Sequence, residues 1–103
     1  MRTIRGRVDS ARALLEGERL KARLHVTADT GETYEAYLPD RELSALIPRS
    51  VLVGEDTTAP PQLLETIEPI LTRLTLARRV RIWSYQERRY ASFLSWRSVR
   101  FAA

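Results

Sequence analysis

The alternation of apolar and polar residues predicts three strands at the start of the chain. In residues 20–28, LKARLHVTA, every second residue is apolar and the residues between are polar or charged. This period of two is typical of a strand with one buried face, because successive side chains point to opposite sides of a sheet. Residues 32–38, ETYEAYL, repeat the pattern after a turn at residues 29–31, so we predict a hairpin. Residues 3–8 alternate in the same way and form the first predicted strand.

The first predicted strand carries a glycine on its apolar side. Gly6 has no side chain there, so a neighbouring backbone can approach closely or the strand can bend. Residues 9–19 have two interpretations: they continue this strand to a turn at residues 16–18, or they form one helical turn that Asp9 or Ser10 caps. We favour the continued, bent strand.

A short helix is predicted after the third strand. Pro39 ends that strand, and we expect Asp40 to cap a helix that continues to about Ile47. Further along, residues 51–53 are a candidate for a brief extra strand, and residues 54–60 are a candidate for an exposed acidic loop.

A longer helix is predicted at residues 61–77, PQLLETIEPILTRLTLA. Pro61 suits its first turn, where the missing N–H has no helical partner in any case. An interior proline costs a helix about 3 kcal/mol, so we expect a kink or a break at Pro69. The apolar stripe continues on both sides of this proline, through Leu63, Leu64, Ile67, Ile70, Leu71 and Leu74.

Residues 78–101, RRVRIWSYQERRYASFLSWRSVRF, predict a last hairpin. They hold seven of the 17 basic residues, one of the 13 acidic residues and six of the eight aromatic residues. We place the turn at Glu87 and Arg88, which pairs Ile82 with Phe93 on the apolar face. The opposite face then carries Arg79, Arg81, Trp83, Tyr85, Tyr90 and Trp96.

The predicted order is β-β-β-α-(α)-β-β, in one domain that comprises residues 1–103. We therefore predict a mostly β fold of the α+β class. Five strands with a helical connection between the third and fourth have the order of the OB-fold, a small five-stranded barrel. The segment ADTGETYEAYLPD also resembles the OB domains of translation initiation factor one and a ribosomal protein. We expect an OB-like or SH3-like barrel, and an α+β sheet with both helices on one face is the remaining alternative.

The composition excludes several classes of protein. The chain has no cysteine, which rules out a disulfide framework, a zinc–thiolate site and a cysteine nucleophile. Its 44% hydrophobic and 29% charged residues are those of an ordinary globular protein. No apolar run approaches the roughly 18 residues of a membrane span, and the N-terminus lacks the apolar core of a signal peptide. We therefore expect a cytoplasmic protein with no membrane partner.

The distribution of charge is more informative than the pI of about 10.1. Of the 17 basic residues, 16 are Arg, and there is no Asn, which a high-GC genome or a thermophilic origin would each explain. Residues 1–25 carry a net charge of +4, residues 26–77 of −6, and residues 78–103 of +6. If the two basic ends are neighbours in the fold, one side of the molecule is positive.

Rings and guanidinium groups on one strand face suit single-stranded nucleic acid. Aromatic rings stack on bases for roughly 1–3 kcal/mol per base, and Arg pairs with phosphate. We therefore expect a non-enzymatic module that binds single-stranded DNA or RNA. The predicted binding residues are Arg5, Arg7, Lys21, Arg23, Arg79, Arg81, Trp83, Tyr85, Arg88, Arg89, Tyr90 and Trp96. Two alternatives stay open: the rings pack under the longer helix, or they meet a protein partner or a second copy of the chain.

Few residues indicate catalysis or metal binding. His25 is the only histidine, and its place on the polar face of a strand predicts an exposed residue rather than a metal ligand. Among the carboxylates, Glu32 and Glu35 lie on opposite faces of a strand, and we interpret Asp40 and Glu42 as helix-capping residues. The four glycines are scattered and form no phosphate-binding loop. We predict no catalytic residue, no metal and no cofactor.

Overall fold

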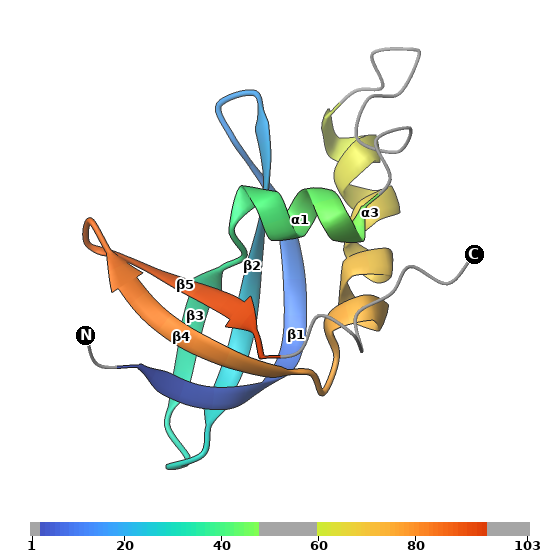
Figure 1. Cartoon of the computed structure of the whole chain (residues 1–103). Helices are drawn as coiled ribbons and strands as arrows, with labels where there is room; N and C mark the ends of the chain where they lie inside the picture. The colour runs from blue at the N-terminus through green and yellow to red at the C-terminus, as the bar shows by residue number, and fades with distance from the viewer. Residues whose placement is uncertain (1–2, 48–59, 95–103) are drawn as a thin grey trace.

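The computed structural model of the chain describes residues 3–47 and 60–94, with the backbone alone described for 60–63 (Figure 1). Its fold is mixed α+β, with a five-stranded sheet and two helices in the described part. The predicted order of strands and helices is confirmed there, and the candidate strand at 51–53 lies outside the described residues. The elements are β1 (Ile4–Glu16), β2 (Arg19–Ala28), β3 (Thr33–Tyr37), α1 (Asp40–Leu46), α3 (Pro60–Thr75), β4 (Arg79–Tyr85) and β5 (Arg88–Phe93).

The five strands form one sheet that closes on itself. The hydrogen-bonded order is β1-β2-β3-β5-β4, and β4 pairs again with β1. All pairings are antiparallel except that of β3 with β5, which is parallel and has a single registered pair, Tyr37 with Tyr90. The pairing of β1 with β4 brings the two basic ends of the sequence together.

β1 is a long strand with a bend, as the favoured interpretation of residues 9–19 predicted. Val8 pairs with Val26 but Ser10 pairs with His25, so an extra residue, Asp9, forms a β-bulge. The close approach predicted at Gly6 is also confirmed. A Cβ atom there would lie 2.6 Å from the Thr27 carbonyl oxygen and 2.7 Å from a methyl carbon of Val26.

The inward faces of the strands form the core together with both helices. Four apolar positions of β2 are buried as the alternation predicted, Ala22, Leu24, Val26 and Ala28, and Leu20 is partly buried against the same core. α3 contributes Ile67 and Leu71, which are also fully buried. α3 packs on β1, where the Thr72 hydroxyl donates a hydrogen bond to the Ala11 carbonyl over 3.2 Å.

The prediction that Asp40 caps α1 is wrong, and of the two outcomes expected at Pro69, a kink or a break, the break does not occur. Asp40 makes no capping hydrogen bond, because its carboxylate accepts a hydrogen bond from Lys21 Nζ at 2.9 Å; Pro39 occupies the N-cap position. α3 is one helix on both sides of Pro69, so the predicted break does not occur. Pro69 and Glu65 are both exposed. Water can therefore hydrate the Glu65 carbonyl, which lacks a helical donor.

The last hairpin has the predicted faces but a different register. Ile82 pairs with Ala91 rather than Phe93, and the turn residues are Gln86 and Glu87 rather than Glu87 and Arg88. The two registers differ by two residues, so every side chain keeps its face. Gln86 and Glu87 have φ angles of 50° and 65°, the geometry of a two-residue type I′ turn. Such turns usually contain Asn or Gly, so the sequence carries no signal for this one.

Candidate functional site

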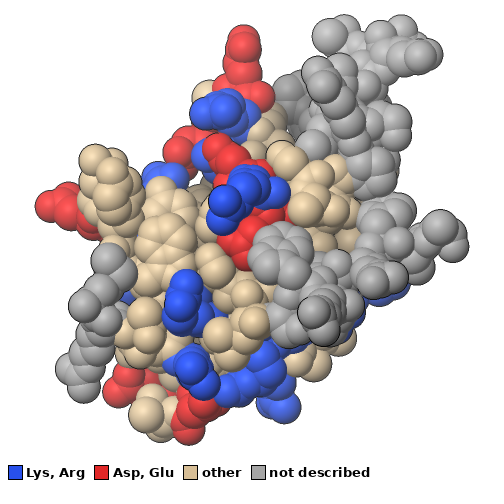
Figure 2. Space-filling model, viewed as in Figure 1, with Lys and Arg blue, Asp and Glu red and all other residues tan. Residues whose placement is uncertain are grey.

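Four arginines from the two ends of the sequence lie together on the outer face of the sheet. The register of β1 with β4 places Arg5 opposite Arg81 and Arg7 opposite Arg79. All four side chains are exposed, and basic side chains gather over β1 and β4 in the lower half of Figure 2. We call these four residues the Arg ladder. Like charges directly opposite each other in a sheet are destabilising, so this arrangement carries a cost in stability.

One carboxylate partly neutralises the Arg ladder. Arg79 donates two hydrogen bonds to Asp29, at 2.7 and 2.8 Å, in a bidentate ion pair. The hydrogen bonds from Arg79 lower the pKa of Asp29, and the positive charge of Arg5 lowers it further. Arg5, Arg7 and Arg81 form no ion pair with any carboxylate in the described ranges, 3–47 and 60–94. Within the part of the chain that the structure describes, three of the four guanidinium groups therefore have no carboxylate within ion-pair distance.

Aromatic side chains continue the same face beyond the Arg ladder. The rings of Trp83 and Tyr90 stack across the hairpin, with centroids 4.8 Å apart and planes 20° from parallel. Tyr85 follows on β4 and is 56% exposed. α3 lies at the side of β1, away from the Tyr85 end of β4 (Figure 1). The other predicted aromatic residue, Trp96, lies outside the described residues.

A buried carboxylate holds the base of the Trp83–Tyr90 stack. Trp83 Nε1 donates a hydrogen bond to Ser92 Oγ at 3.2 Å, and Ser92 Oγ donates one to Glu42 Oε2 at 2.9 Å. The Phe93 amide donates to Glu42 Oε1 at 3.0 Å. Glu42 is only 2% exposed, and this burial raises the pKa of its carboxyl group. The sequence pattern indicated a capping role for Glu42, and no local pattern could show that it contacts β5.

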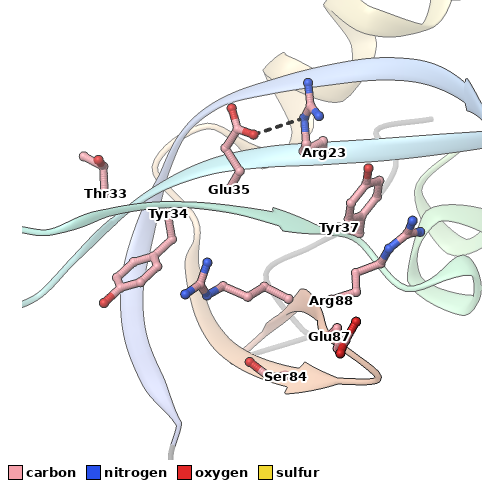
Figure 3. A pocket seen from close by; sticks show the side chains of 9 residues that line it. Arg23, Thr33, Tyr34, Glu35, Tyr37, Ser84, Glu87 and Arg88 are labelled. Atoms are coloured by element: carbon pink, nitrogen blue, oxygen red, sulfur yellow. Dashed lines mark ion pairs between the residues drawn. The ribbon is translucent and has the colours of Figure 1, made fainter.

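A second group of predicted residues lines a groove between β3 and the β4–β5 hairpin (Figure 3). The groove has a volume of about 680 Å³. β3 and β5 pair only at Tyr37 and Tyr90, so the sheet is open beyond that point. We call this the hairpin groove, and the lining residues that matter below are Arg23, Tyr34, Glu35, Tyr37, Arg88 and Arg89.

Guanidinium groups already cover two of the rings in the hairpin groove. The Arg88 guanidinium lies 4.2 Å from the centroid of the Tyr37 ring, and that of Arg89 lies 5.1 Å from the centroid of Tyr34. Arg88 also donates two hydrogen bonds of 3.0 Å to Glu16, near the end of β1. These hydrogen bonds lower the pKa of Glu16. A ligand that stacked on Tyr37 would have to displace Arg88.

The remaining predicted basic residues are paired with carboxylates. Arg23 Nε lies 3.6 Å from Glu35, whose other oxygen lies 2.8 Å from His25 Nε2. Lys21 Nζ contacts Asp40, on α1. Arg88 and Tyr90 are two residues apart on β5 and share its outer face, so the hairpin groove adjoins the rings beside the Arg ladder. The Arg ladder, with Trp83, Tyr85 and Tyr90 beside it, is one group; Arg23, Arg88 and Arg89 line the hairpin groove; Lys21 lies apart from both.

The described residues contain no group of three or more side chains suited to hold a metal ion. His25, exposed as predicted, contacts one carboxylate, Glu35. Neither helix of the described part is both long enough and apolar enough to cross a membrane.

Comparison of the chain with protein-family models, curated proteins and solved structures finds no match. Evidence on function therefore comes from the geometry of the Arg ladder and of the hairpin groove.

Proposed function

We propose that this protein is a non-enzymatic module that binds single-stranded nucleic acid or RNA through the Arg ladder and the adjacent rings. The observation that carries the proposal is the direct pairing of Arg5 with Arg81 and of Arg7 with Arg79. This pairing costs stability in the free protein. Local features that destabilise the fold are expected at functional sites. A bound polyanion would compensate the positive charge of the paired guanidinium groups and so remove their mutual repulsion.

The rings beside the Arg ladder support nucleic acid over a simple anion. A single strand offers phosphates to guanidinium groups and bases to aromatic side chains, and both kinds of group lie on the outer face of β4. Arg81 and Trp83 are separated by one residue, so their side chains leave the same face of the strand about 6.7 Å apart. That spacing allows one nucleotide to contact both.

The topology supports an OB-like barrel over an SH3-like one. The strand order β1-β2-β3-β5-β4, closed by β1 and β4, places the helical connection between β3 and β4, as in the OB-fold. OB-folds bind oligonucleotides with the face of strands 2 and 3 and with the loops beside it. The hairpin groove lies at the corresponding place, between β3 and the β4–β5 turn. This support is a fold-level analogy.

A second candidate function is that of an adaptor or a small subunit of a larger assembly. Tyr85 and Leu94 are 56% and 41% exposed, and aromatic residues and Arg are the types that protein interfaces enrich. Light scattering at several concentrations separates the two functions. A stable homo-oligomer whose formation shields Trp83 from a collisional fluorescence quencher would favour the adaptor.

The proposed function is tested by fluorescence anisotropy with a labelled single-stranded oligonucleotide between about 50 and 200 mM salt. The double variant Arg5→Ala with Arg81→Ala removes two charges of the Arg ladder that have no described carboxylate partner. We expect the slope of log K against log salt to fall by about 1.4, because each phosphate contact on a single strand contributes about 0.7.

A matched control removes the same charge elsewhere. Arg41→Ala with Arg73→Ala takes two exposed guanidinium groups from the helices, and we expect it to leave the slope nearly unchanged. Equal losses in the two double variants would mean that only the net charge matters. Absence of measurable binding by the unmodified protein at the lowest salt concentration would remove the proposed function.

A further inference from the structure

The Arg ladder is short, and acidic side chains limit it on one side. On the outer face of β1, Asp9 follows Arg7 and accepts a hydrogen bond from the Thr27 hydroxyl of β2. Asp29 lies at the end of β2, where its amide donates to the Arg5 carbonyl over 2.9 Å and its carboxylate binds Arg79. A phosphate chain that continued in this direction would meet these two carboxylates. The positive surface therefore ends at β2.

In the other direction, along β4, aromatic side chains follow the guanidinium groups. The outer face of β4 presents Arg79, Arg81, Trp83 and Tyr85 in that order, because every second residue of a strand shares a face. Trp83 extends this surface sideways through its stack on Tyr90. A ligand that fits this face has its highest negative charge at one end and its first base next to that end.

A small hollow marks the charged end of the face. It has a volume of about 220 Å³ and is lined by Arg7, Thr27, Ala28, Asp29 and Arg79. Two guanidinium groups of opposite strands therefore border one depression. Asp29 occupies the two donors of Arg79 that an incoming phosphate would otherwise take.

The charge of the Arg ladder matches a strand terminus better than the middle of a strand. Of the two neighbouring carboxylates, Asp9 and Asp29, only Asp29 forms an ion pair with the Arg ladder in the described residues, so three of the four guanidinium groups have no ion-pair partner there. A terminal phosphomonoester carries a charge of about −1.5 to −2 at neutral pH, and the phosphodiester that follows it adds one more negative charge. Two internal phosphodiesters would compensate only two of the three charges.

From these observations, and on the basis of the proposed function, we infer that the Arg ladder binds the terminal phosphate of a single nucleic-acid strand. Arg7 and Arg79 hold the terminal phosphate at the hollow, and Arg5 and Arg81 hold the next phosphate. The first bases stack on Trp83 and Tyr90. Asp29 acts as an internal counter-ion that an incoming phosphate replaces on Arg79.

The test compares three oligonucleotides of the same sequence, each with the same internal fluorescent label. One carries a 5′-phosphate, one a 3′-phosphate, and one hydroxyl groups at both ends. We expect one of the phosphorylated strands to bind at least about tenfold more tightly than the hydroxyl strand, the effect of one charge-assisted hydrogen bond. The strand that gains identifies the end that the Arg ladder recognises.

Two variants connect this preference to the site. Arg7→Ala should weaken binding of both strands and abolish the preference, so that the phosphorylated strand and the hydroxyl strand bind the variant with equal affinity. Asp29→Asn should strengthen binding of the phosphorylated strand, because Arg79 no longer has an anionic partner. A misfolded variant does not gain affinity, so the Asp29 result stands even if Arg7→Ala is unstable.

The outcomes separate this inference from the proposed function. Equal binding of all three strands, still weakened by Arg5→Ala with Arg81→Ala, would overturn terminal recognition and leave nucleic-acid binding in place. A phosphate preference that persists in Arg7→Ala would also overturn the assignment to the Arg ladder. Lack of binding to any of the three strands would remove both proposals.

Discussion

The buried carboxylate of Glu42 should be a major determinant of stability. In Glu42→Ala, the amide of Phe93 and the hydroxyl of Ser92 both lose the acceptor that they now contact at 3.0 and 2.9 Å. A buried donor that loses its acceptor costs about 1–3 kcal/mol, and the lost buried methylene adds about 0.8 kcal/mol. Relief of the desolvated charge offsets part of this sum. We expect a net loss of about 2–3 kcal/mol in the free energy of unfolding.

The loss is measured by urea unfolding and by thermal unfolding followed by circular dichroism. For a domain of this size, 1 kcal/mol shifts the melting temperature by roughly 4–8 °C, so Glu42→Ala should melt roughly 10–20 °C lower. Glu65→Ala on the exposed face of α3 is the matched control, and we expect a change within about 0.5 kcal/mol. If the two variants had equal melting temperatures, Glu42 would not hold β5 through these hydrogen bonds.

The pH dependence of Glu42→Gln provides a second, independent measurement. Burial raises the pKa of Glu42 above 4.5, so the folded state binds a proton more tightly than the unfolded state. Its contribution to stability is therefore full below pH 4.5 and is lost as the pH rises through the raised pKa. The glutamine side chain of the variant does not titrate, so the stability of the variant relative to the unmodified protein should increase from about pH 4 to about pH 7. A difference that stays constant or decreases over this range would refute the reasoning.

Three further predictions concern the sheet and its last turn. Arg81→Thr should raise the free energy of unfolding by about 0.5 kcal/mol at low salt, because it removes a like-charge pair with Arg5. This gain should shrink at about 1 M salt, where the charges are screened. A lower melting temperature than that of the unmodified protein at low salt would contradict the prediction. Glu87→Gly should raise the free energy of unfolding by about 1 kcal/mol, because glycine adopts the φ of 65° without strain. An unchanged urea midpoint would argue against a positive φ at this residue. Gly6→Ala should lower the free energy of unfolding by about 2–3 kcal/mol, because the added Cβ would clash with the Thr27 carbonyl oxygen. A urea midpoint equal to that of the unmodified protein would show that β1 and β2 can separate at this position.

The elements were predictable where one strong local signal was present. The alternation of residues 20–38 identified the β2–β3 hairpin and its buried face, and alternation likewise separated the two faces of the last hairpin. Pro39 correctly marked the end of β3. The role of its neighbour Asp40 was predicted wrongly because Lys21, which is distant in the sequence, binds the carboxylate that was expected to cap α1.

The register of the last hairpin was less predictable than its faces. A shift by two residues keeps every side chain on its side of the sheet, so hydrophobic alternation cannot distinguish the two registers. The turn residues would normally decide between them, but Gln86 and Glu87 adopt positive φ without the usual glycine or asparagine. Contacts outside the hairpin, such as that of Glu42 with Phe93, accompany the observed register.

The sequence by itself determined which side chains face inward on β2, β3 and the last hairpin, because that property follows from a local period of two residues. On β1 the bulge at Asp9 shifts the buried positions to Ala11 and Ala13, which the period of two does not predict. The sequence also showed that both ends of the chain are basic. Only the tertiary structure decided which basic residues are neutralised. Arg88 and Glu16 lie 72 residues apart in the sequence, and Arg79 and Asp29 lie 50 apart. The pairing of β1 with β4 likewise decided that Arg5 meets Arg81, because closure of the sheet depends on contacts between the two ends of the chain.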